Sequence, residues 1–264
     1  MTVRYTSSLC ALPRKRCANM KRTYGWIKDK EDSRDRLYKL SRPRIATLKP
    51  FVDLRKSCSK VEDQGTLGSC TANALAGNIE LLDKLIDGAY TDVSRIFLYY
   101  NERAMEGTIS EDAGAMIRDG IKTLAKDGIC AETLCPYDIE AFTRKPLPEA
   151  YEDAKKHLIT SYMRITTLNE MLVCLSDGYP FVFGMDLYES FESDKISKTG
   201  KVPMPKDGEE YLGGHAVMAV GYNLITKQFI VRNSWGEGWG REGYFTIPFD
   251  YLVKYGADFW TVRK

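Results

Sequence analysis

The sequence predicts an α+β fold in which a mainly helical first half is followed by a mainly β second half. Apolar residues recur at helical spacing between residues 70 and 127. Short apolar runs typical of strands dominate from residue 180 onward. Pro136, Pro146 and Pro148 mark loop between the two regions. At 264 residues, 44% of them hydrophobic, the chain can bury one substantial core or two small ones.

The helices follow from apolar spacing and from start and stop signals. We expect helices over residues 70–87, 94–106 and 113–127, and Gly128 is a natural terminator of the third. Thr167 and Glu170 form the pattern of a capping box, which predicts a short helix through Leu175. Four strands are expected after it, over residues 180–185, 215–223, 228–233 and 243–247.

One cysteine stands where a thiol can become a nucleophile. Cys70 follows a glycine-containing turn and opens a predicted helix, whose dipole favours negative charge. A thiolate also needs a nearby imidazole. Of the two histidines, His157 lies in a charged helical stretch, which indicates a surface or packing role for it. His215, flanked by glycines and a buried apolar run, is the candidate base.

The order Gln64, Cys70, His215 and Asn233, the last within Asn-Ser-Trp-Gly, resembles the papain family of cysteine peptidases, and the chain is similar in particular to a bacterial member. The likeness extends from Pro50 to the C-terminus. It implies a papain-like two-lobe fold, with a helical left lobe over about 50–160 and a β-barrel-like right lobe over about 161–264. The active site would lie in the cleft between them. Residues 1–49 would form a separate N-terminal extension.

The resemblance also implies a role for each matching residue. Cys70 would attack the scissile carbonyl, and His215 would hold the thiolate as an imidazolium and then protonate the leaving amine. Asn233 would orient the imidazole beneath Trp235. Gln64 would donate its side-chain amide to the oxyanion beside the backbone N–H of Cys70, a contribution of about 3 kcal/mol to transition-state stabilisation.

Substrate contacts are implied less directly. Gly114 occupies the place where the family pairs with an extended peptide. Met185 and Ala216 would line an apolar pocket with Tyr251 at its base, and Trp235 would also border the substrate. An alternative for Met185 is that it simply fills the core.

Two positions depart from the family's pattern. Leu67 stands where a disulfide-forming cysteine is usual, and Thr71 replaces a tryptophan that normally packs beside the reactive pair. Neither change removes the nucleophile, the base, the residue that orients the base or the oxyanion donor, so activity is still expected.

The N-terminal segment differs in charge from the rest of the chain. Residues 1–50 carry 14 Lys or Arg and 4 acids, which leaves 24 basic and 32 acidic residues afterwards, so the two parts are +10 and −8. Such a segment could bind the acidic body, an anionic surface or nucleic acid. We hypothesise that part of residues 1–45 lies over the active site and restrains it, as a zymogen segment would. A disordered basic arm is the alternative.

The remaining features leave compartment and pairing open. The N-terminus lacks the apolar core of a secretory signal, no apolar run is long enough to span a membrane, and both export and a cytoplasmic location stay possible. Cys58 could pair with Cys130 or Cys135 if the protein is exported, or all could stay reduced. We find no metal-ligand spacing, cofactor motif or nucleic-acid fold motif.

Together these features predict a cysteine endopeptidase that acts on polypeptides through an acyl-thioester on Cys70. Two alternatives use the same cleft: an acyl transferase or amidase with the same triad, and a non-catalytic binding scaffold. Retention of all four residues that would carry out the reaction argues against a non-catalytic binding scaffold.

Overall fold

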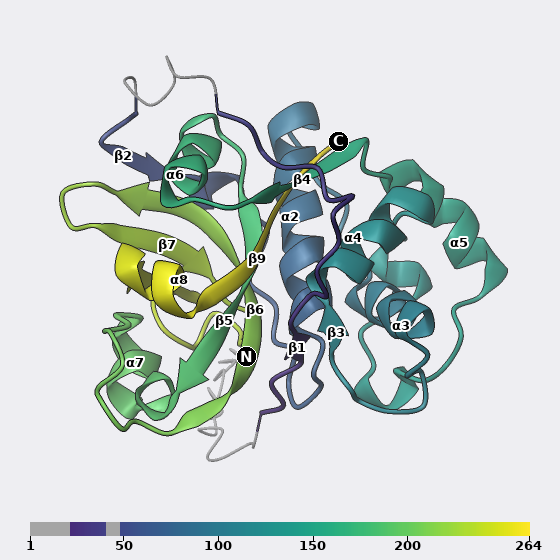
Figure 1. Ribbon diagram of the computed structural model, residues 1–264. Helices are drawn as coiled ribbons and strands as arrows, with labels where there is room; N and C mark the ends of the chain where they lie inside the picture. The colour runs from purple at the N-terminus through teal and green to yellow at the C-terminus, as the bar shows by residue number, and fades with distance from the viewer. Residues whose placement is uncertain (1–21, 41–47) are drawn as a thin grey trace, which may run out of the picture.

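The computed structural model describes residues 22–40 and 48–264. A helical lobe and a sheet lobe stand side by side (Figure 1). The helices are α2 (Cys70–Asp87), α3 (Arg95–Glu106), α4 (Ile117–Lys126), α5 (Pro148–Ala154), α6 (Leu168–Ser176), α7 (Asp194–Thr199) and α8 (Phe249–Tyr255). The strands are β1 (Trp26–Ile27), β2 (Phe51–Asp53), β3 (Ala115–Met116), β4 (Ser161–Ile165), β5 (Phe181–Tyr188), β6 (Tyr211–Asn223), β7 (Gln228–Arg232), β8 (Tyr244–Pro248) and β9 (Gly256–Arg263).

The sheet lobe is built on a seven-stranded antiparallel sheet. Its strands run in the order β4-β9-β5-β6-β7-β8, and β2 pairs with β6 beside this path. Within the described residues β4 and β8 do not pair with each other, so the sheet is barrel-like but open. The long strand β6 lies next to β5, β7 and β2, and it also contacts α2 of the other lobe.

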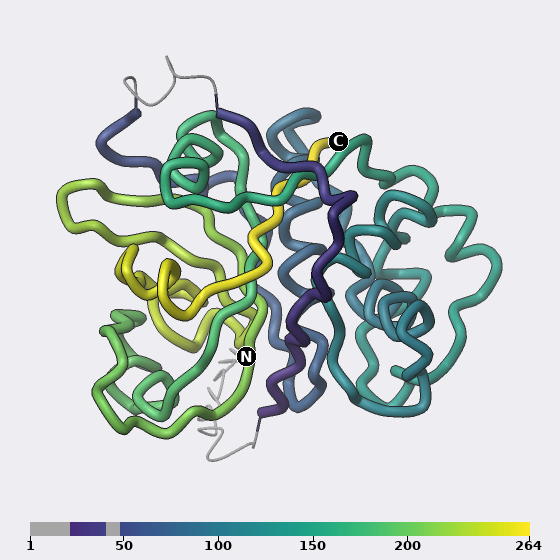
Figure 2. The backbone as a smooth tube through the Cα atoms, viewed as in Figure 1, coloured from purple at the N-terminus to yellow at the C-terminus, as the bar shows by residue number. Residues whose placement is uncertain are grey.

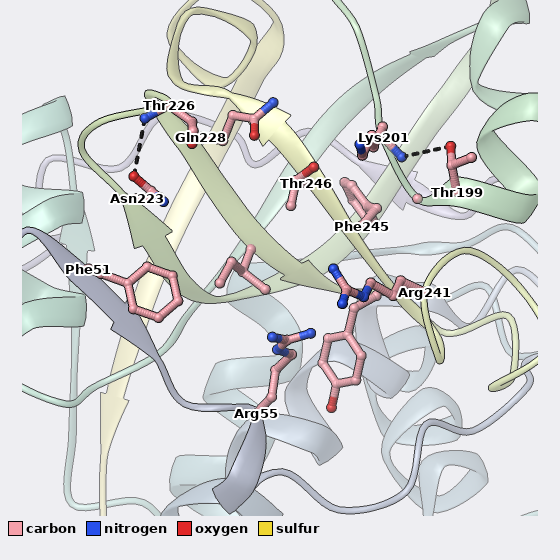
Figure 3. A pocket seen from close by; sticks show the side chains of 13 residues that line it. Phe51, Arg55, Thr199, Lys201, Asn223, Thr226, Gln228, Arg241, Phe245 and Thr246 are labelled. Atoms are coloured by element: carbon pink, nitrogen blue, oxygen red, sulfur yellow. Dashed lines mark hydrogen bonds between the residues drawn. The ribbon is translucent and has the colours of Figure 1, made fainter.

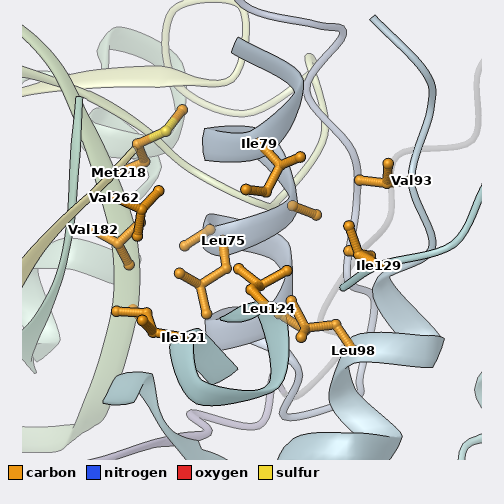
Figure 4. Close-up of a cluster of buried hydrophobic side chains, with 14 of the residues drawn as sticks. Leu75, Ile79, Val93, Leu98, Ile121, Leu124, Ile129, Val182, Met218 and Val262 are labelled. Atoms are coloured by element: carbon orange, nitrogen blue, oxygen red, sulfur yellow. The ribbon is translucent and has the colours of Figure 1, made fainter. Parts of the chain in front are cut away.

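The helical lobe is organised around α2. Leu75 and Ile79 of this helix are fully buried and meet Ile121 and Leu124 of α4 in one cluster (Figure 4). The same cluster includes Val182, Met218 and Val262 from the sheet, so the apolar core is continuous across the lobe boundary. This continuity fixes α2, and therefore its N-terminus, against the sheet.

The α+β two-lobe fold is confirmed, and so are several elements. The first helix spans Cys70–Asp87 as predicted and ends at Gly88, which is left-handed. The capping box is present: the Thr167 side chain accepts from the backbone N–H of Glu170, and the Glu170 carboxylate accepts from the backbone N–H of Thr167. His157 has a packing role, with Nδ1 3.3 Å from Asp83 Oδ2.

The prediction of a helix from residue 113 is wrong over its first turn. Gly114 has a φ of 75°, which interrupts a right-handed helix. Ala115–Met116 then forms strand β3, which pairs in parallel with β1, and the helix begins at Ile117.

The two ends of the segment from residue 48 to residue 264 cross between the lobes. Strand β2 precedes the helical lobe in the sequence, yet it pairs with β6 in the sheet lobe. Lys264, at the other end, reaches α2 and forms an ion pair with Asp83. Residues 22–40 run between the lobes, along the seam visible in Figures 1 and 2.

Candidate active site

The turn that leads into Cys70 is held by partly buried polar contacts. The backbone N–H of Gly68 donates to both carboxylate oxygens of Asp112 at 3.0 Å, and Tyr99 donates its hydroxyl to the same carboxylate at 2.5 Å. Ser69 and Tyr137 share a hydrogen bond of 2.7 Å between their hydroxyls. Cys70 is therefore presented at the first position of α2, fully buried.

His215 is positioned from the sheet lobe. It lies on β6 opposite Met185 of β5, and its Nε2 is 2.8 Å from Oδ1 of Asn233. The indole of Trp235 stacks on the imidazole at 5.0 Å between ring centroids. Because Nε2 is engaged with Asn233, the other nitrogen, Nδ1, is left for a second partner, and it has none among the described residues.

The two lobes meet at the sulfur. The backbone N–H of Ala216, the residue after His215, donates to Cys70 Sγ at 3.4 Å. This contact joins residues 146 positions apart in sequence. The structure thus brings together the predicted nucleophile, the predicted base and the amide that orients the base.

Gln64 is held at both ends of its side-chain amide. Its Nε2 donates to the carbonyl oxygen of Leu67 at 2.8 Å, and its Oε1 accepts from the hydroxyl of Ser234 at 2.6 Å. An amide nitrogen carries two hydrogens, so one remains for another acceptor. Ser234 was not singled out from the sequence, although its place directly after Asn233 is the signal that could have found it.

Burial favours the uncharged forms of both Cys70 and His215 in this arrangement. Burial raises the pKa of the Cys70 thiol to about 11, against the lowering effect of the backbone N–H groups of Ala216, Gly25 and Thr71. Burial likewise lowers the pKa of His215 to about 4, assisted by the positive charge of Arg22 and opposed by the bond to Asn233. Burial therefore opposes the thiolate and imidazolium that the sequence led us to expect, and that ion pair stays a prediction.

Residues of the N-terminal segment lie beside the pair, and the backbone N–H of Gly25 acts on the Cys70 sulfur. Ala115 donates its N–H to the carbonyl oxygen of Gly25 at 2.8 Å. A Cβ atom at Gly114 would lie 2.1 Å from that oxygen, so only glycine allows this approach. Trp26 lies against the sheet lobe, where a Cβ at Gly184 would be 1.9 Å from its ring and one at Gly214 would be 2.6 Å from it.

The predicted substrate residues lie in two different surroundings. Gly114 and Ala216 lie beside Gly25 and Cys70, respectively. Met185 and Tyr251 are buried in the apolar cluster of the sheet lobe, and the Tyr251 hydroxyl donates to the carbonyl oxygen of Asp186 at 2.8 Å. Their roles toward a substrate stay predictions. Gly184, which the sequence analysis did not select, is the β5 residue that meets Trp26.

One cavity of the described chain is separate from the candidate site. A cavity of about 300 Å³ lies over β2, β7 and β8, and it holds none of the predicted site residues (Figure 3). Within residues 22–40 and 48–264 we find no cluster of metal-ligating side chains and no helix long and apolar enough to cross a bilayer. Cys58, Cys130 and Cys135 are free thiols, whereas Cys10 and Cys17 lie outside the described residues.

Comparisons with known proteins agree with this geometry. The family model described as papain family cysteine protease matches residues 48–256. A peptidase C1-like protein of Acanthamoeba polyphaga mimivirus is 42% identical over 94% of this chain and 88% of its own length. The crystal structure of xylellain, a cysteine protease from Xylella fastidiosa, superposes with a TM-score of 0.85 at 39% identity, covering 94% of this chain and 99% of that one.

A more distant relative is cysteine proteinase 3 of Entamoeba histolytica, which is 26% identical over 75% of this chain. The match spans 62% of that relative's length, less than two thirds. The expected resemblance to a bacterial papain-like enzyme is confirmed by the likeness to xylellain. This chain belongs to the papain family of cysteine peptidases.

Proposed function

We propose that Cys70, His215, Asn233 and Gln64 carry out the endopeptidase reaction of this family on polypeptides, and that residues 22–27 hold the site in a resting state. The contact between the Ala216 N–H and Cys70 Sγ carries the proposal, because it brings the sulfur beside the residue that directly follows His215.

In the reaction His215 would take the proton of the Cys70 thiol on Nδ1, and the resulting thiolate would attack the peptide carbonyl carbon. Asn233 would keep the ring oriented through its bond to Nε2. The free amide hydrogen of Gln64 and the backbone N–H of Cys70 would stabilise the oxyanion. His215 would then protonate the leaving amine, and water would hydrolyse the acyl-thioester.

The covering residues account for the uncharged resting pair. While Gly25 and Trp26 lie over the site, water is excluded and the ion pair is disfavoured. Release of these residues would let water in and would remove the charge of Arg22, whose guanidinium lies 4.3 Å from the centroid of the Trp235 ring. Both effects favour the imidazolium, so uncovering and activation would be one event.

Polar anchors support this restraint. The Asp29 carboxylate accepts from Trp260 Nε1 at 2.8 Å and from the backbone N–H of Arg118 at 3.1 Å, while its own backbone N–H donates to Asp258 at 2.7 Å. Asp35 pairs with Arg118 at 2.5 Å. These contacts tie the segment to both lobes.

An epoxide that alkylates active-site thiolates tests the chemistry. Full-length protein should be labelled at Cys70 alone, and Cys70→Ala should show neither labelling nor hydrolysis of a fluorogenic peptide. Absence of labelling under all conditions would overturn the catalytic assignment in favour of a binding scaffold.

The restraint is tested by Gly25→Ala in the full chain. A Cβ at Gly25 would lie 1.8 Å from the carbonyl oxygen of Gly68, so the segment has to leave its position. Labelling of Cys70 should become faster, while Lys28→Ala, an exposed position in the same segment, should behave as the parent. Equal rates in all three proteins would refute the restraint.

A further inference from the structure

The residue after the nucleophile makes a buried contact that the mechanism does not use. Thr71 is fully buried, and its hydroxyl donates to Oε2 of Glu102 at 2.7 Å. Glu102 lies on α3 and is also fully buried. Thr71 is the position where this chain departs from its family's usual tryptophan, so the contact is a feature of this sequence.

The surroundings of Glu102 do not suit a carboxylate. Its Oε1 has no hydrogen-bond partner among the described residues. The cation next to it in sequence, Arg103, donates instead to the carbonyl oxygens of Tyr99, Ile109, Glu111 and Phe142. The other charged groups that act on Glu102 are Glu106 and Asp119, and both disfavour a second negative charge.

The protonated form is therefore the stable one. Burial, first of all, and the two neighbouring acids raise the pKa of Glu102 well above its usual value, against the lowering effect of Thr71 and Arg103. A negative charge here would also raise the pKa of Cys70. A neutral carboxylic acid avoids that penalty and still accepts the hydrogen bond from Thr71.

Gly120 of α4 makes room for this side chain. A Cβ at Gly120 would lie 2.3 Å from Oε1 of Glu102 and 2.5 Å from Cδ1 of Leu75. The carboxyl group is thus confined between α4 and the first turns of α2, with Thr71 as its hydrogen-bonding partner.

We propose that Glu102 is a positioning residue for the nucleophile: as a neutral acid it fixes Thr71, and through Thr71 the first turn of α2 that carries Cys70. The backbone N–H of Thr71 acts on the sulfur, so the orientation of this residue affects how readily the thiolate forms. This inference rests on the proposed role of Cys70 as nucleophile.

The test is the pH dependence of Cys70 alkylation by iodoacetamide, followed by peptide mass spectrometry in full-length protein that carries Trp26→Ala to open the site. Thr71→Val keeps the shape of the side chain and removes the hydroxyl. We expect it to slow alkylation about tenfold at pH 6, which corresponds to the loss of one hydrogen bond to a buried group, and to move the acid limb of the profile to higher pH. Thr71→Ser should restore both.

A matched control separates positioning from stability. Thr123 is a buried threonine of the same lobe whose hydroxyl contacts the sulfur of Met105 at 3.4 Å. Thr123→Val should leave the alkylation profile unchanged even if it lowers the melting temperature. Unchanged alkylation in Thr71→Val would overturn the inference, while labelling of Cys70 in the parent would leave the catalytic proposal intact.

Glu102→Gln tests the protonation state. Glutamine keeps the acceptor for Thr71 and cannot ionise, so its acid limb should coincide with that of the parent. A shift of that limb to lower pH by half a unit or more would mean that the parent carries a charge at Glu102, and it would overturn the neutral-acid assignment.

Discussion

Truncation of Trp26 to alanine should activate the full-length chain. The indole is half-buried against the sheet lobe, where Gly184 and Gly214 leave space for its ring. Removing a fully buried tryptophan costs about 3–5 kcal/mol, and a half-buried one about 2 kcal/mol. Because 1.4 kcal/mol is a factor of ten, the fraction of molecules with an open site should rise about 30-fold.

The assay is the second-order rate of epoxide labelling at Cys70, measured by intact mass at equal protein concentration. Ile27→Ala is the matched control, since Ile27 is the next residue of the same strand and is 38% exposed. Its rate should stay within about twofold of the parent rate, because exposed truncations cost little. If Trp26→Ala labels no faster than Ile27→Ala, the ring does not hold the segment and the restraint has been misassigned.

Three further outcomes follow from the same contacts. Gly184→Ala should also accelerate labelling, because the added Cβ would occupy the space of the indole; a parent-like rate would contradict this. Ser234→Ala should lower kcat/KM about tenfold with little change in KM, because Gln64 loses the bond that fixes its amide, and a KM effect alone would argue against an oxyanion role. Covering lowers the pKa of His215 to about 4, so this group weakens covering as the pH falls from about 6.5 to 4. Covering raises the pKa of Asp29 to about 6, chiefly through burial, so this group strengthens covering as the pH falls from about 6 to 4. The effects of these two groups on covering oppose each other. Hydrogen exchange at the Ala115 amide, corrected for intrinsic rates, should therefore vary little with pH in the parent and should rise on acidification in Asp29→Asn. An equal pH dependence in both proteins would refute the compensation.

Local signals predicted the elements that local interactions determine. Cys70 opens its helix because small and apolar residues follow it at helical spacing, and the capping box at Thr167 is complete within four residues. The candidate catalytic residues could be proposed from the sequence because their motifs are distinctive, although the contacts between them are long-range.

The parts that the sequence did not predict depend on partners distant in the chain. Strand β9 contains Asp258 at a φ of 53°, and it is stabilised by β4 and β5. Strand β3 forms only because β1 lies beside it. Glu102 carries no motif, and its importance appears only when Thr71 is seen to donate to it.

The crossing of the two chain ends has a consequence for biosynthesis. Strand β2 emerges early from the ribosome, yet the β6 residues that pair with it lie about 170 residues later, and Lys264 follows its partner Asp83 by 181 residues. Contacts so distant in sequence form late in folding. His215 and Asn233 also lie in the last third of the chain, so a nascent or truncated polypeptide would contain the cysteine without its base. The topology therefore delays assembly of the candidate site until the segment that carries His215 and Asn233 has been made.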